Sequence, residues 1–130
     1  MQLLIVRHAE AAKGSPDELR PLTGAGRDQA RSLGRRLREE GFTPDAILVS
    51  PLLRARETAQ LLGRELGVEP VPDERLAPGA TASEVAEAAG EAGERVVVVG
   101  HEPDCSHVTV ALGGGPEPHF PPCGAVALTL

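Results

Sequence analysis

The chain has 130 residues, a formal net charge of −6 at pH 7, and only 2% aromatic residues. Its negative charge disfavours binding to nucleic acid or to anionic membranes. The scarcity of aromatic rings leaves no stacking platform for single-stranded nucleic acid. The length predicts a single domain over residues 1–130. With no Trp or Tyr, its core must be built from Leu, Val, Ala and Ile.

The two cysteines, Cys105 and Cys123, lie in neither a metal-ligand spacing nor a CxxC pattern. We expect free thiols in a reducing compartment. No apolar run approaches the roughly 20 residues needed to cross a bilayer, so we expect a cytoplasmic location.

The first third of the chain predicts a strand, a loop and a helix. The apolar run Gln2–Val6 is typical of a buried strand. Residues 9–22 are polar and predict a loop. A helix follows from about Thr23, a plausible N-cap, to Glu40. Its arginines at spacings of three and four favour a solvated face over a surface for an acidic partner: Arg27, Arg31, Arg35 and Arg38.

The middle of the chain repeats this pattern. Asp45–Val49 predicts a second strand, and Leu52–Leu66 predicts a helix that ends at Gly67. Val68–Val71 is at best a short edge strand, because the prolines beside it limit ladder pairing.

The last third adds a helix, a strand, a helix and a strand. Thr81–Glu84 is a capping-box pattern that opens a helix reaching about Ala92. Four consecutive valines make Arg95–Val99 the strongest strand signal. A helix over Pro103–Leu112 and a strand over Ala125–Leu130 follow.

Strands that alternate with helices predict an α/β fold. We expect a three-layer α/β/α sandwich with a mostly parallel central sheet. The last strand or the proline-flanked one could run antiparallel at an edge.

Basic and imidazole side chains follow three of the predicted strands. The first strand ends at Arg7-His8, the second leads into Ser50 and then Arg54, and the valine-rich strand ends at Gly100-His101. In open α/β sheets, ligands bind outside the carboxyl ends of the strands. Arginine forks and helix N-termini at that edge favour a phosphoryl group.

Such a group of residues suits phosphoryl transfer. A neutral imidazole can attack phosphorus, and a second histidine can stabilise the transferring group by hydrogen bonding. No His or carboxylate cluster in the sequence predicts a metal site, and we expect no cofactor. The arginines must then supply the neutralising charge that Mg²⁺ often provides.

Four segments, in order and spacing, resemble the histidine phosphatase superfamily, which has the phosphoglycerate mutase-like fold. The segment around Arg7-His8 resembles the family's opening RHG-type motif, with Ala9 where Gly is usual. The other three segments are Leu22–Gly26 with Gln29-Ala30, Ser50–Ala59, and Val99–Pro103. Together the four cover nearly the whole chain.

The resemblance implies a role for each site residue. His8 would be the phosphorylated nucleophile, and Arg7, Arg54 and His101 would form the phosphate pocket. The small size and the Arg20-Pro21-Leu22-Thr23 string make the chain most similar to SixA-type phosphohistidine phosphatases. Arg20 is then a candidate phosphate or substrate contact, although it could equally be a surface loop residue.

Ser50 and Gly100 are further candidate substrate-binding residues. We expect Ser50 to be a turn residue rather than a nucleophile, because no Asp-His pair is arranged to activate it. Gly100 would allow close backbone approach beside the phosphate. We expect the other histidines, His107 and His119, to lie at the surface.

A general acid is missing from its usual place. Larger members of the superfamily carry a Glu after the third strand, but here Asp73–Gly79 has no Glu just after Leu76. Glu74, Glu10 and Asp17 could substitute. Without a positioned acid, a phosphoramidate such as phosphohistidine is a better substrate than a sugar phosphate.

Two other functions stay open. One is a phosphatase or phosphomutase acting on a small phosphorylated metabolite rather than on a phosphorylated protein. The other is a non-catalytic phosphate-binding module. The sequence does not predict the oligomeric state.

Overall fold

A computed structural model describes all 130 residues. Five strands form one sheet in the order β3-β2-β4-β1-β5. The strands are β1 (Gln2–Arg7), β2 (Ala46–Val49), β3 (Pro70–Pro72), β4 (Arg95–Gly100) and β5 (Ala125–Thr129). The helices are α1 (Gly24–Glu39), α2 (Leu53–Leu66), α3 (Ala82–Ala92) and α4 (Asp104–Gly113), with 3₁₀ turns η1 (Asp17–Leu19) and η2 (Glu74–Leu76).

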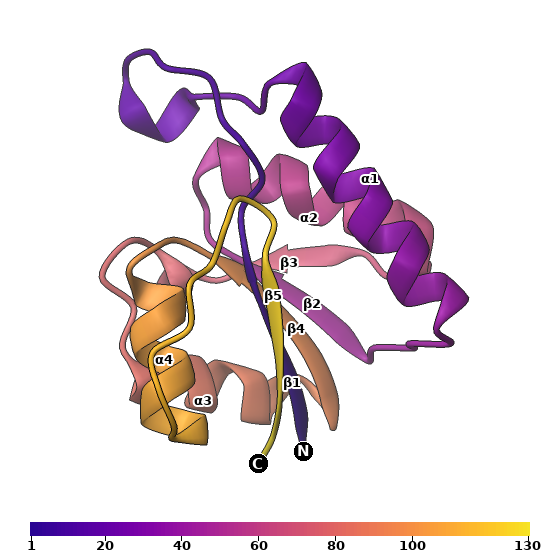
Figure 1. Cartoon of the computed structure of the whole chain (residues 1–130), viewed down its shortest axis with the longest axis vertical. Helices are drawn as coiled ribbons and strands as arrows, with labels where there is room; N and C mark the ends of the chain where they lie inside the picture. Colours follow the sequence, from indigo (N-terminus) through magenta and orange to yellow (C-terminus); the bar gives the residue numbers. More distant parts are fainter.

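The sheet separates two apolar cores, one under each pair of helices. In β4, Val97 and Val99 pack with α1 and α2, whereas Val96 and Val98 pack with α3 and α4. Both faces of this central strand are therefore buried, which explains its unbroken run of valines. Figure 1 shows α1 and α2 on one side of the sheet and α3 and α4 on the other. The predicted α/β/α sandwich is confirmed.

Local signals in the sequence set the ends of the helices. The Thr23 hydroxyl accepts a hydrogen bond from the Gly26 N–H at 2.9 Å, which caps α1 as predicted. Thr81 and Glu84 form the predicted capping box at the start of α3. Gly67 ends α2 with φ of 72°, a left-handed conformation that favours glycine. The arginine stripe of α1 lies on its solvated face, as expected.

The two edge strands differ in direction. β3 runs parallel to β2, and β5 runs antiparallel to β1. The Asp73 N–H donates to the Val49 carbonyl, so the nitrogens of Pro70 and Pro72 face the open edge, where no donor is needed. The strand predicted over Val68–Val71 begins two residues later in the structure and ends one residue later.

The region predicted as a loop over residues 9–22 is more ordered than expected. It contains the turn η1, and Ala11 forms an isolated bridge with Leu22. The chain ends lie side by side, since the N-terminal ammonium of Met1 donates to the Leu130 carbonyl at 3.1 Å (Figure 1). None of the helices has the length and apolar character required to span a membrane.

Candidate active site

Strand register brings two histidines together. β1 and β4 are parallel neighbours, with Val6 opposite Val99 and Arg7 opposite Gly100. The next residue on each strand is a histidine, and the His8 N–H donates to the Gly100 carbonyl at 2.9 Å. The centroids of the His8 and His101 rings consequently lie 5.3 Å apart.

His8 is held as a neutral imidazole with one nitrogen free. Its Nδ1 lies 2.7 Å from the Ala9 carbonyl oxygen, which can only accept, so Nδ1 carries the proton and donates. This leaves Nε2 unprotonated, with its lone pair available. Burial, helped by the nearby charges of Arg54 and Arg7, lowers the pKa of His8 to about 4. The ring therefore remains neutral at physiological pH.

His101 is buried, at 4% exposure, and one of its ring nitrogens has a side-chain hydrogen-bond partner. Its Nε2 shares a 2.7 Å hydrogen bond with the hydroxyl of Ser50, at the end of β2. Its other nitrogen, Nδ1, is buried and has no hydrogen-bond partner. Burial, followed by repulsion from His8 when that ring is protonated and from Arg54, lowers the pKa of His101 to about 4.

Two arginines flank the histidines, each tied by a backbone carbonyl. Arg7 donates from Nη1 to the Phe120 carbonyl at 3.0 Å. Arg54, in the first turn of α2 and 6% exposed, donates from Nη1 to the Asp17 carbonyl at 2.9 Å. The Nε atoms of both arginines are buried without a partner. Only one other buried side-chain nitrogen or oxygen in the chain lacks a partner, and it is Nδ1 of His101.

All four predicted catalytic residues line one pocket of about 420 Å³, at the carboxyl ends of the strands. Arg20 lines it as well, where its Nε pairs with the Asp17 carboxylate at 3.0 Å. The same carboxylate lies 3.3 Å from Nη2 of Arg54. Although partial desolvation opposes the shift, Arg54 and Arg20 together lower the pKa of Asp17. Asp17 is therefore ionised and unsuited to act as an acid.

Ser50 and Gly100 do not line this pocket. Ser50 is fully buried behind His101 and also accepts a bond from the Leu52 N–H at 3.3 Å, as expected of a turn residue. A Cβ added to Gly100 would meet only Cys105 Sγ, at 3.9 Å. No protein atom therefore requires glycine at this position, and a close approach of Gly100 to the phosphate stays a prediction.

Two residues that the sequence analysis missed hold the loop after His8. The buried Thr58 hydroxyl accepts from the Ala9 N–H at 3.0 Å and donates to the Arg54 carbonyl at 2.8 Å. A Cβ on Gly26 would overlap the Glu10 carbonyl oxygen, so only glycine lets α1 approach that loop. A signal for Thr58 was available, since it lies one helical turn after Arg54 on an otherwise apolar face.

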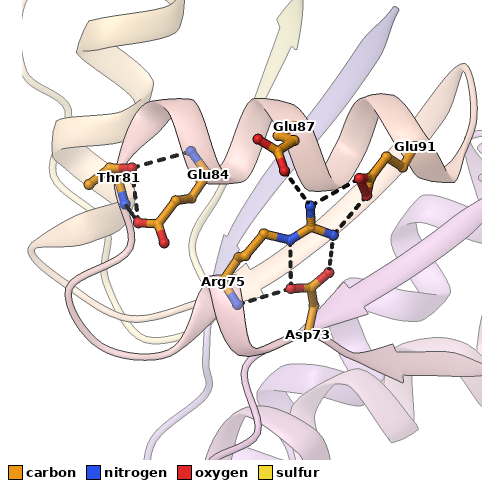
Figure 2. A network of polar contacts seen from close by, with 6 residues as sticks. All are labelled: Asp73, Arg75, Thr81, Glu84, Glu87 and Glu91. Atoms are coloured by element: carbon orange, nitrogen blue, oxygen red, sulfur yellow. Dashed lines mark hydrogen bonds and ion pairs between the residues drawn. The ribbon is translucent and has the colours of Figure 1, made fainter.

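The segment between β3 and α3 forms one rim of the pocket through Pro78 and makes several polar contacts. The Arg75 guanidinium pairs with Asp73 at 2.7 Å, Glu91 at 2.9 Å and Glu87 at 3.1 Å, as Figure 2 shows. The Asp104 carboxylate accepts from the Gly79 N–H at 2.7 Å. These contacts connect the rim to α3 and to the start of α4.

Of the three candidate acids, Glu10 and Asp17 line the pocket, whereas Glu74 does not. Glu102 also lines it, and both of its carboxylate oxygens accept bonds from Ser106 in α4, as expected of a residue before a helix. The other histidines, His107 and His119, are exposed as expected.

No group of three or more His, Cys, Asp or Glu side chains is arranged to hold a metal ion. Both cysteines are unpaired and buried. Burial raises the pKa of Cys105 and of Cys123 to about 12, so neither is a nucleophile.

Known proteins share both the sequence pattern and the fold. Residues 3–78 match the family model described as histidine phosphatase superfamily, branch 1. An uncharacterised protein of Picosynechococcus is 38% identical over 92% of this chain and 77% of its own length. The phosphohistidine phosphatase SixA of Escherichia coli is 30% identical over 98% of this chain and 83% of its own length.

The structural likeness extends along the chain. A structure of the protein histidine phosphatase SixA complexed with tungstate superposes with a TM-score of 0.92, at 29% identity, covering 100% of this chain and 88% of that one. The fold is thus the phosphoglycerate mutase-like α/β fold that the motifs implied. The chain belongs to the histidine phosphatase superfamily, is a phosphatase of that superfamily, and is similar to its SixA-type members over its whole length.

Proposed function

We propose that this phosphatase hydrolyses phosphohistidine on a protein through a covalent intermediate on His8. One observation carries the proposal: the three buried polar atoms that lack a partner belong to Arg7, Arg54 and His101, around a neutral His8. Buried hydrogen-bond donors normally have a partner, so three unpaired donors at one pocket indicate that an anion binds there. SixA, whose structure superposes on this chain, forms a complex with tungstate, which is itself an oxyanion.

The reaction has two steps. Nε2 of His8 attacks phosphorus, a P–N bond forms, and the bond from phosphorus to the leaving nitrogen breaks as that nitrogen's ring departs. The Ala9 carbonyl continues to accept the hydrogen bond from Nδ1–H of His8, and this bond stabilises the phosphorylated ring. Water then attacks phosphorus and the bond to Nε2 breaks. Inorganic phosphate is released and neutral His8 is regenerated.

His101 and the two arginines stabilise the transferring group. The Ser50 hydroxyl already accepts from the Leu52 N–H, so its own proton is available to Nε2 of His101. Nδ1 of His101 would then carry a proton and donate a hydrogen bond to a phosphoryl oxygen. Ser50 is thus a positioning residue. Arg7 and Arg54 neutralise charge without a metal, and Arg20 adds a further contact to the substrate.

The substrate class follows from the leaving group. Asp17 is ionised and Glu74 lies outside the pocket, so Glu10, whose carboxylate accepts from the Thr23 hydroxyl at 3.2 Å, is the one candidate acid left. The ring of a phosphohistidine can take its own proton on the nitrogen remote from phosphorus, and this makes it a good leaving group. The alkoxide that leaves a sugar phosphate has no second site for a proton. Without an acid, hydrolysis of the sugar phosphate would be slower by about 10²–10⁴-fold.

A cytoplasmic location remains a prediction.

Acid-quenched turnover with a labelled phosphohistidine protein tests the proposal. The wild-type enzyme should yield a phosphoenzyme that is labile in acid and stable in base. His8→Ala should abolish it, while His107→Ala, a change at an exposed histidine, should not. Turnover by the wild type with no such intermediate would remove the assigned role of His8. Faster turnover of a sugar phosphate would instead support the small-molecule alternative.

A further inference from the structure

We infer that the pocket selects phosphoryl donors whose leaving group is neutral or cationic and rejects those that carry a carboxylate or a second phosphate. This inference rests on the proposed function, because it concerns the leaving-group side of the same pocket. It is carried by the charges that remain at the pocket once a phosphoryl group is bound.

The buried and the exposed parts of the pocket have opposite charges. The phosphoryl group is assigned to Arg7 and Arg54, beside the two neutral histidines. The remaining charged residues of the lining are Glu10, Asp17, Arg20 and Glu102, which we call the pocket mouth. One guanidinium and three carboxylates remain there, so the pocket mouth carries two negative charges in excess.

The carboxylates of the pocket mouth are not equally neutralised. Asp17 has two cationic partners, Arg20 at 3.0 Å and Arg54 at 3.3 Å. Glu10 accepts only from the Thr23 hydroxyl at 3.2 Å. Glu102 accepts from the Ser106 N–H at 2.8 Å and the Ser106 hydroxyl at 2.6 Å. Glu10 and Glu102 therefore have no cationic partner, and both residues belong to the pocket lining.

The only guanidinium of the pocket mouth, that of Arg20, has few free donors with which to bind a second anion. Arg20 already pairs with Asp17 through Nε and lies 3.4 Å from the Ala12 carbonyl through Nη1. The apolar residues of the lining are Ala9, Ala11, Pro78 and Pro122, so the pocket offers only small apolar side chains against which a nucleobase could pack. Beyond the phosphoryl group, charge is the main feature by which the pocket mouth can discriminate.

Imidazole fits this selection. A phosphorylated histidine carries no negative charge beyond its phosphoryl group, and its ring becomes cationic when protonated. Glu10 and Glu102 favour that protonated ring. They repel the carboxylate of a phosphoglycerate or the second phosphate of a bisphosphate. The expected substrate is thus a phosphorylated side chain in a neutral or basic surface.

A pair of non-hydrolysable ligands measures the selection without requiring turnover. The probes are benzylphosphonates that carry either a trimethylammonium or a carboxylate group at the para position, and their Kd values are measured by calorimetry. Wild-type protein should bind the cationic ligand about tenfold more tightly at low salt, and the gap should shrink as ionic strength rises.

Charge-neutral variants locate the effect. Glu10→Gln and Glu102→Gln should each narrow the gap about threefold. Glu39→Gln removes the same charge from the exposed face of α1 and should leave the gap unchanged. Equal Kd values for the two ligands, or a gap that survives both Glu10→Gln and Glu102→Gln, would overturn the inference. Failure to bind either ligand would also overturn it.

The outcome separates this inference from the proposed function. If phosphohistidine is not hydrolysed but the charge gap is present and falls in the two variants, the selection stands and the proposed reaction fails. If phosphohistidine is hydrolysed through His8 but the gap is absent, the reaction stands and the selection is wrong.

Discussion

Protonation of His8 and His101 should destabilise the fold as the pH falls below 6.5. In the unfolded chain each ring takes up a proton near pH 6.5, whereas in the folded protein the pKa of each is about 4. Between these values the unfolded chain binds more protons, so a falling pH favours unfolding. Stability is therefore greatest above pH 6.5 and declines through the window down to pH 4.

The magnitude follows from the two shifts. Lowering the pH from 6.5 to 5 would cost at most about 3 kcal/mol for the two histidines together. Both rings face an open pocket, where solvent screens part of the effect, so we expect about half of that, roughly 1.5 kcal/mol. This is a measurable fraction of the ~5–15 kcal/mol that stabilises a typical domain.

Urea unfolding followed by far-ultraviolet circular dichroism provides the assay, because the chain has no Trp or Tyr to report by fluorescence. The His8→Gln and His101→Gln variants should each lose about half of the decline, and the double variant nearly all of it. His119→Gln, which changes an exposed loop histidine, should keep the wild-type decline. Constant wild-type stability from pH 6.5 to 5, or an unaltered decline in the double variant, would refute the reasoning.

Three further predictions concern the frame around the pocket. Gly26→Ala should lower the free energy of unfolding, measured in urea, by about 1–3 kcal/mol, because the added methyl group overlaps the loop after His8. Gly24→Ala, two residues earlier in α1, has space for a methyl group and should be tolerated. Thr58→Val leaves a buried backbone N–H unpaired, so it should cost about 1–3 kcal/mol and lower kcat, while Thr109→Val, whose hydroxyl only donates within α4, should cost less and spare kcat. Arg75→Gln leaves three carboxylates without their shared cation (Figure 2), so we expect a lower Tm, most clearly at low salt, with kcat within about twofold of wild type; a large loss of kcat would contradict a purely structural role.

Most of the architecture could be predicted from local patterns. The unbroken apolar run of β4, the capping residues Thr23 and Thr81, and the stop at Gly67 each depend on residues close in sequence. The direction of β5 could not be predicted, because the apolar pattern of a strand is the same in either orientation. Residues 114–124 run from the end of α4 back to the carboxyl edge of the sheet, so β5 enters from that edge and pairs antiparallel with β1. On the way they bring the Phe120 carbonyl to Arg7.

The sequence by itself determined that Arg7, His8, Arg54 and His101 lie at one edge of the sheet, because parallel strands all end on the same side. Only the tertiary structure decided how they meet. The strand order makes β4 the neighbour of β1, and the register sets His101 beside His8. The pairing of Asp17 with Arg54, 37 residues away, depends on the path of a loop. Contacts of this kind arise from non-local packing, which no local pattern of residues encodes.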